Sequence, residues 1–167
     1  MRPCYRVRQF WQALTAAPKP AAPPELGPGL RELFLRMPSA DRAHAMRTCH
    51  RLQAAGQQPA DLEVAALLHD VGKSGPQVHL WDRVLFVVGG RLAPAWLARL
   101  LAEAPRWPGL VALQAHAEQG ARLVAGAGGT ARTVELIRCH HAASANLPWP
   151  EGERRLLEAL QRADESS

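Results

Sequence analysis

Histidine and aspartate residues recur along this 167-residue sequence in an order that points to metal chemistry. Seven histidines are present, and most such residues in proteins are ordinary surface or core side chains. Here several of them fall on separate segments, some beside an aspartate or a second histidine. Such segments can aim imidazole and carboxylate groups at one point. The residues that can converge in this way are His44, His69, Asp70, His116, His140, His141 and Asp164.

Neutral imidazole nitrogen and carboxylate oxygen suit first-row divalent metals such as Mn, Fe, Co, Ni or Zn. His69 and Asp70 cannot point the same way on a regular helix, but at a helix end both can reach one centre. A carboxylate has two oxygens, so Asp70 can bridge two metals. A metal pair can lower the pKa of a shared hydroxide and stabilise both oxygens of a phosphoryl displacement. Burying so many polar groups without a metal would be costly.

The elements that position these residues are expected to be helices. Alanine, leucine and arginine are abundant, whereas β-branched and aromatic residues are scarce, and no alternating strand pattern occurs. Ser39 or Asp41, Asp61 and Thr130 are expected N-caps, Gly89-Gly90 is expected to separate two helices, and a break is possible near His116. The expected helices span residues 30–37, about 39–55, 61 to the HDVGK stretch, 81–88, 94–103, 108–125, 131–142 and 151–163.

The chain therefore reads as an all-α, compact bundle of six to eight helices, preceded by an arm. Residues 5–16 form a short basic helix in this interpretation, and the stretch PKPAAPPELGPG at 18–29 is an extended linker. We expect residues 1–29 to be a basic N-terminal arm with a Pro-rich linker, and residues 30–167 to be the functional domain.

The net charge of +5 and the sequence pI near 9.9 suit an anionic partner such as a nucleotide, a nucleic acid or a phosphate ester. A genome rich in G and C also produces many arginines, so charge alone does not choose among these. Three widely spaced cysteines argue against a disulfide framework. No signal peptide or transmembrane segment is recognised, because charges and glycines interrupt the apolar stretch 80–101. We expect a cytoplasmic protein.

The spaced motifs resemble those of the HD-domain metal-dependent phosphohydrolase superfamily, most closely its HDIG-type members. The resemblance covers roughly residues 30–165, and HDVGK stands in place of HDIGK. An HD dipeptide alone is a weak signal, whereas an ordered series of motifs is a strong one. The matching stretches are DRAHAMRTCHRLQAAG, AALLHDVGK, HAEQGARL, LIRCHH and LQRAD.

The resemblance implies roles for individual residues. Four residues match the ligands of a first metal: His44, His69, Asp70 and Asp164. Asp70 would also bridge to a second metal, held further by His116 and His140, and the nucleophile would be metal-bound hydroxide. Lys73 matches a lysine that approaches the substrate phosphate or the bridging solvent. His141 is either a second-metal ligand or a phosphate contact, and the sequence leaves both roles open.

Departures from the family narrow the expectation. The subgroup that hydrolyses cyclic di-GMP carries Gly-Tyr-Pro after the paired histidines, whereas AASANLPWP follows His141 here. Members with a third metal have a glutamate at the position occupied by Ala40. We therefore expect at most two metals and no cyclic di-GMP specificity. Alanine also follows His116, where the family often has proline.

Some residues have ordinary interpretations that compete with functional ones. His50 lies six residues after His44, on another helical face, so it is expected at the surface, as is His79. Arg83 and Arg138 are candidates for phosphate contact beside Lys73, although most arginines here solvate a surface. Cys139 reads as an inert core thiol.

The leading hypothesis is an enzyme that hydrolyses a phosphomonoester or phosphodiester of a nucleotide-like substrate. The alternative is a non-enzymatic module that binds a nucleotide or protein partner and uses the metals as structural staples. Nucleic-acid binding through the basic arm is a third reading, and it predicts a steep salt dependence. The substrate, the metal identity and the oligomeric state do not follow from the sequence.

Overall fold

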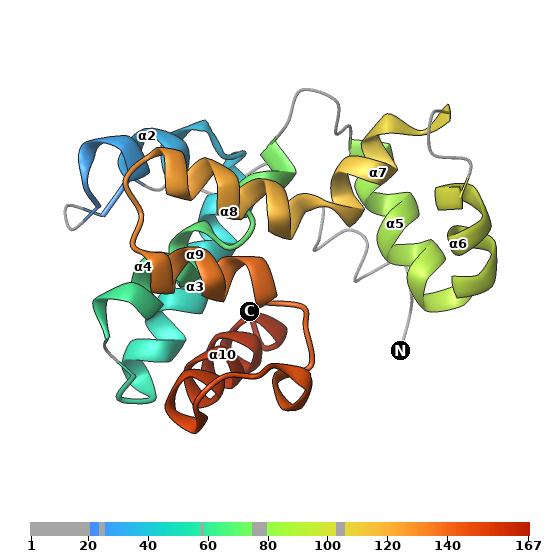
Figure 1. The fold of residues 1–167 in the computed structure, drawn as a ribbon. Helices are drawn as coiled ribbons and strands as arrows, with labels where there is room; N and C mark the ends of the chain where they lie inside the picture. Colours follow the sequence, from blue (N-terminus) through green and yellow to red (C-terminus); the bar gives the residue numbers. More distant parts are fainter. Residues whose placement is uncertain (1–20, 24–25, 58, 75–79, 103–105) are drawn as a thin grey trace, which may run out of the picture.

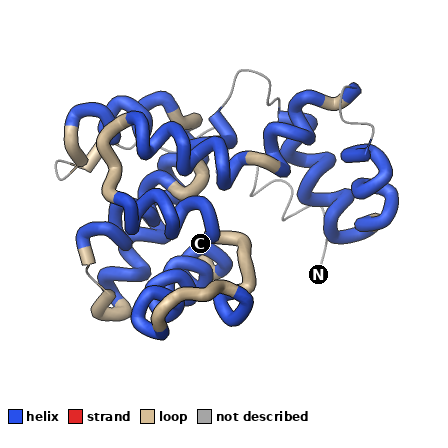
Figure 2. Tube along the Cα trace, in the orientation of Figure 1, coloured by secondary structure: helices blue, strands red, loops and turns tan. Residues whose placement is uncertain are grey.

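The computed structural model describes residues 21–23, 26–57, 59–74, 80–102 and 106–167. The expected helix over 5–16, Cys4 and His79 lie outside these ranges. Within them the secondary structure is helical, with no strand (Figure 2). The all-α expectation is confirmed. The α-helices of the described part are α2 (Pro28–Arg36), α3 (Ser39–Ala54), α4 (Ala60–Leu68), α5 (Leu80–Leu92), α6 (Pro94–Ala102), α7 (Pro108–Gln114), α8 (His116–Gly126), α9 (Ala131–Cys139) and α10 (Glu151–Glu165).

Helix α4 lies at the centre of the bundle, because its residues after Glu63 are all apolar. Leu62, Ala65, Ala66 and Leu68 are completely buried, and the helix packs against α3, α9, α10 and α2. Figure 1 shows these helices together, with α5, α6 and α7 forming a second group at the other end of the molecule. The 3-10 helix η1 (Val71–Ser74) follows α4 and packs against α8 and α7.

Several helix boundaries agree with expectation, and the differences have physical causes. The segment 108–125 divides at Ala115, next to His116, as anticipated. Thr130 caps α9 by accepting a hydrogen bond from the Thr133 backbone N–H at 3.1 Å. The expected break at Gly89-Gly90 is wrong, because α5 continues to Leu92. There the glycine backbone lies against Leu97 of α6, and a Cβ on either glycine would be in ordinary van der Waals contact with that side chain.

The other expected caps are not formed. Pro38 occupies the N-cap of α3 without a side-chain hydrogen bond, so neither Ser39 nor Asp41 has that role. Asp61 lies inside the first turn of α4. Its Oδ1 instead accepts a hydrogen bond from Thr130 Oγ1 at 2.7 Å, which joins α4 to the start of α9.

The described part of the expected linker lies against the domain. Ala22 and Leu26 are buried in the core, and α2 begins at Pro28, a favoured residue for the first helical turn. The boundary between an arm over 1–29 and a domain over 30–167 stays a prediction. None of the described helices is long and apolar enough to cross a membrane.

Candidate metal centre

The first group of candidate ligands joins three helices. His44 lies on α3 and Asp164 on α10, and His44 Nε2 is 2.7 Å from Asp164 Oδ1. His69, at the end of α4, places its Nε2 3.3 Å from the same oxygen. One ligand atom from each residue can be chosen so that all three lie within 4.8 Å of one another, so a single metal ion fits among them.

The end of α4 explains how two consecutive residues reach one centre. The α-helix ends at Leu68, His69 is its C-cap, and the chain tightens into η1 from Val71. This change of helical pitch lets Asp70 face the side that His69 faces, with His69 Nε2 and Asp70 Oδ1 3.6 Å apart. The sequence argument for a helix end at His69-Asp70 is supported by this geometry.

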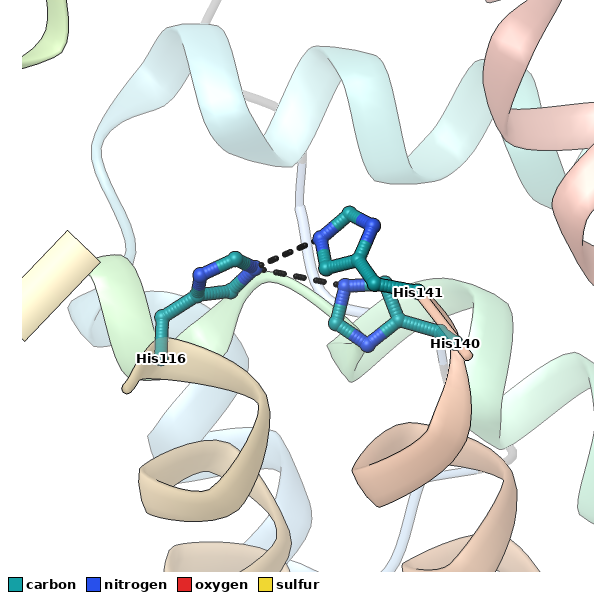
Figure 3. Close-up of side chains that lie close together, drawn as sticks. All are labelled: His116, His140 and His141. Atoms are coloured by element: carbon teal, nitrogen blue, oxygen red, sulfur yellow. Dashed lines mark hydrogen bonds between the residues drawn. The ribbon is translucent and has the colours of Figure 1, made fainter. Parts of the chain in front are cut away.

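A second group contains three histidines, shown in Figure 3. His116 is the first residue of α8, and His140 and His141 directly follow the end of α9. His116 Nε2 lies 3.3 Å from His140 Nε2 and 3.1 Å from His141 Nε2. The inner rings of His116 and His140 are buried, whereas His141 is exposed, so the group opens toward solvent at His141.

Asp70 lies between the two groups. Its Oδ1 is 3.7 Å from His116 Nε2 and 3.9 Å from His140 Nε2, in addition to its approach to His69. Lys73, one turn later, places its ammonium 2.7 Å from the same oxygen. A carboxylate between two histidine groups has the placement that a bridging ligand requires.

Backbone carbonyls fix the orientation of three of the histidines. The Nδ1 atoms of His69, His116 and His140 lie at hydrogen-bond distance from the carbonyls of the residues three positions earlier, which are Ala66, Leu113 and Ile137. A carbonyl only accepts, so each Nδ1 carries the proton and donates it. In the neutral ring Nε2 is then an acceptor, and these Nε2 atoms point into the site.

Burial and neighbouring charges set the protonation of the site. Burial lowers the pKa of His116 to about 4 and that of His140 to about 3, so both rings are neutral at pH 7. Burial also lowers the pKa of His69, but Asp70 and Asp164 outweigh it and the net shift is upward. Burial raises the pKa of Asp70 and of Asp164. His69 and Lys73 lower the pKa of Asp70, and His44 and His69 lower the pKa of Asp164. These effects outweigh burial, so both carboxyls are ionised.

These residues fit a divalent metal. The neutral rings of His116 and His140 both donate through Nδ1, so each has a lone pair on Nε2. These two Nε2 atoms lie 3.3 Å apart, which is unfavourable unless a cation lies beside them. His69 Nε2 and Asp70 Oδ1 are buried without a hydrogen bond of good geometry, despite the ion pair with Lys73. Unsatisfied buried acceptors and carboxylates of this kind are typical of metal ligands.

The remaining predicted residues lie elsewhere or are engaged. Arg138 Nε donates to Glu118 at 2.8 Å and its guanidinium also contacts Glu135, so two carboxylates already bind it. Arg83 belongs to α5, and its side chain is outside the described part of the structure. His50 is exposed, as expected. Burial raises the pKa of Cys139, which agrees with an inert thiol.

Sequence reasoning missed two features of the site. Gly72 allows η1 to touch α8, since a Cβ there would meet the His116 carbonyl oxygen at 2.0 Å. Gln161, one turn before Asp164 on α10, donates to backbone carbonyls beside the paired histidines. The sequence signal for both is weak, because a glycine after a helix and a glutamine on an amphipathic helix are common.

The fold and the site together define an all-helical protein with a histidine–aspartate centre suited to divalent metals. Comparison with known families adds a match to the HD domain over residues 42–166, and the chain belongs to this family. The chain is thus a member of the superfamily of metal-dependent phosphohydrolases. No curated protein and no solved structure gives a significant match.

Proposed function

We propose that this protein hydrolyses a phosphomonoester or phosphodiester of a nucleotide-like substrate and uses two divalent metal ions. The observation that carries the proposal is the position of Asp70 between two histidine groups, with the Lys73 ammonium at its carboxylate. Membership of the HD domain family supports the reaction class. The proposal places the chain among the HDIG-type members, on the HDVGK stretch.

The candidate ligands would bind the two metals as two groups. One metal would be held by His44, His69 and Asp164, and the other by His116, His140 and His141. Asp70 would bind both metals. His141 is assigned to the second metal because its Nε2 lies 3.1 Å from His116 Nε2. When bound, the pair supplies Lewis-acid activation of water and of the phosphoryl oxygens. Candidate ions are Mn, Fe, Co, Ni and Zn.

The protein's own groups would bind and orient the substrate. A phosphate ester would approach the buried carboxylate from the side of the exposed His141. There the Lys73 ammonium can contact a phosphate oxygen and offset charge that develops on it. The carbonyls of Ala66, Leu113 and Ile137 keep three imidazoles aimed at the centre, so that little reorganisation is needed.

The test is metal content combined with hydrolysis. Protein loaded with Mn²⁺ or Fe²⁺ is expected to cleave bis-p-nitrophenyl phosphate or a member of a panel of nucleotides and cyclic dinucleotides. The Asp70→Ala variant should be inactive and depleted of metal, whereas His50→Ala, a change at an exposed histidine of the same chain, should behave as wild type. An inactive protein with two bound metals would instead favour a metal-stapled binding module.

The compartment is a separate proposal. Cys49 and Cys139 are free thiols, which suits a reducing environment such as the cytoplasm. Localisation of a tagged chain by cell fractionation tests this.

A further inference from the structure

The side chain of Gln161 connects α10 to the turn that carries the paired histidines. Its amide Nε2 donates to the carbonyl oxygen of His140 at 3.1 Å and to that of Ala142 at 2.8 Å. These two carbonyls flank His141 in the chain. One side chain of α10 therefore holds the backbone on both sides of the most exposed histidine of the second group.

The backbone at this position needs such a partner. Helix α9 ends at Cys139, and carbonyls that follow a helix end have no acceptor role within the helix. A glutamine amide has two N–H groups, so it can donate to both carbonyls at once. Without these bonds the turn could relax and move both imidazoles, since side-chain direction follows the backbone.

The two histidines depend on this turn to different degrees. His140 has a further restraint, because its Nδ1 is held by the Ile137 carbonyl. The ring of His141 contacts other histidines of the group: its Nε2 approaches His116, and its centroid lies 3.9 Å from that of His140. The direction of His141 thus follows from the conformation of the 140–142 backbone.

We infer that Gln161 is a positioning residue for the second metal, an inference that rests on the proposed two-metal function. Helix α10 then serves both groups: Asp164 is a ligand in the first, and Gln161 fixes the turn of the second. Loss of the Gln161 donor is expected to lower the affinity for the second metal by about 10- to 100-fold, the usual effect of removing a group that orients a metal ligand. The affinity for the first metal should be unchanged.

The experiment measures both metals in two variants of the full chain. Gln161→Glu keeps the shape but removes the donor and sets a carboxylate against two carbonyls, and Gln161→Met removes the donor without a charge. Titration calorimetry with Mn²⁺ gives the two dissociation constants, and the visible absorption of the Co²⁺ form reports coordination. Gln119→Glu, an exposed glutamine of α8, is the control for added negative charge.

In both Gln161 variants the dissociation constant of the first metal is expected to be unchanged and that of the second metal to be larger. Gln119→Glu is expected to give wild-type values for both. Should Gln161→Glu fail to fold in circular dichroism, Gln161→Met carries the comparison. Wild-type affinity for both metals in the Gln161 variants would overturn this inference alone. A wild-type chain that binds a single metal would overturn the two-metal proposal and this inference with it.

Discussion

At the residue scale, the centre depends on which nitrogen each histidine presents. His69, His116 and His140 lie at or just beyond helix ends, and each donates Nδ1–H to a carbonyl three residues earlier. This shared local geometry points three Nε2 atoms into a buried space. The orientation of these rings therefore follows from the local conformation of the chain.

Lys73 provides a test at a single side chain. Its ammonium lies beside Asp70 Oδ1 and near the proposed position of a phosphate oxygen. Lys73→Ala is expected to lower kcat/KM by about 10²- to 10³-fold, the usual effect of losing one electrostatic contact to the transition state. Metal content, measured by elemental analysis, should stay at two ions per chain. Loss of metal together with activity would show that Lys73 acts mainly on Asp70.

The depressed pKa values of His116 and His140 predict acid sensitivity of the metal-free protein. Unfolded histidines titrate near 6.5, whereas these native rings titrate at about 4 and about 3. Between pH 6 and pH 4 the unfolded chain therefore binds more protons, and the free energy of unfolding must fall as pH falls. The raised pKa of His69 does not oppose this, because that ring is protonated in both states across most of the window.

Denaturant unfolding in EDTA at several pH values measures this effect. The free energy of unfolding should decrease steadily from pH 6 to pH 4. His116→Asn, which removes one of the two buried rings, should flatten the dependence, while His50→Asn should keep the wild-type slope. A free energy of unfolding that rises toward pH 4 would contradict the assignment of neutral rings.

At the element scale, the contact between η1 and α8 sets the distance from Asp70 to His116. A Cβ on Gly72 would lie 2.0 Å from the His116 carbonyl oxygen and 2.8 Å from the Gly120 nitrogen. Both are backbone atoms, so α8 would have to move. Gly72→Ala is expected to lower the free energy of unfolding by about 1–3 kcal/mol, as overpacking does. It should also lower the affinity for the second metal.

A glycine of the contacting helix α8 controls for backbone entropy. A Cβ on Gly126 of α8 would meet nothing within 4 Å, and this residue does not have a positive φ. Gly126→Ala should therefore be neutral or stabilise the protein by up to about 1 kcal/mol. Equal losses in both variants, measured by urea denaturation, would mean that the η1–α8 contact is not the cause.

Element boundaries show where sequence reasoning works and where packing decides. Proline, glycine and Thr130 marked helix ends correctly, because those residues act on the backbone locally. The expected break at Gly89-Gly90 and the expected cap at Asp61 are wrong, because packing against other helices decides both positions. Helix α5 continues through the glycines beside Leu97 of α6, and Asp61 bonds to Thr130, which is 69 residues away. A local pattern carries no information about either contact.

At the scale of the whole molecule, the candidate ligands were predictable but their supporting contacts were not. The order of histidines and aspartates along the helices identified every member of the two groups in the structure. The sequence left His141 undecided, since adjacent histidines on a regular helix diverge. The turn held by Gln161 places His141 Nε2 beside His116 Nε2, which supports the ligand role that we propose, and this turn depends on α10 packing beside α9.

The ligands also tie distant parts of the chain together, which predicts that metal stabilises the fold as a whole. His44 on α3 and Asp164 on α10 are 120 residues apart, and His69 lies between them on α4. Metal that binds only the native arrangement adds about 2.7 kcal/mol at a concentration 100 times its Kd. For a domain of this size that raises Tm by roughly 5–10 °C.

The measurement is Tm by differential scanning calorimetry in EDTA and in increasing Mn²⁺. His44→Ala should reduce the metal-dependent rise in Tm, because one of the first group's ligands is lost, whereas His50→Ala on the same helix should retain it fully. A rise of equal size in both variants would place the bound metal away from His44. A rise that disappears completely in His44→Ala but not in His50→Ala would mean that the second group binds metal only when the first group is intact.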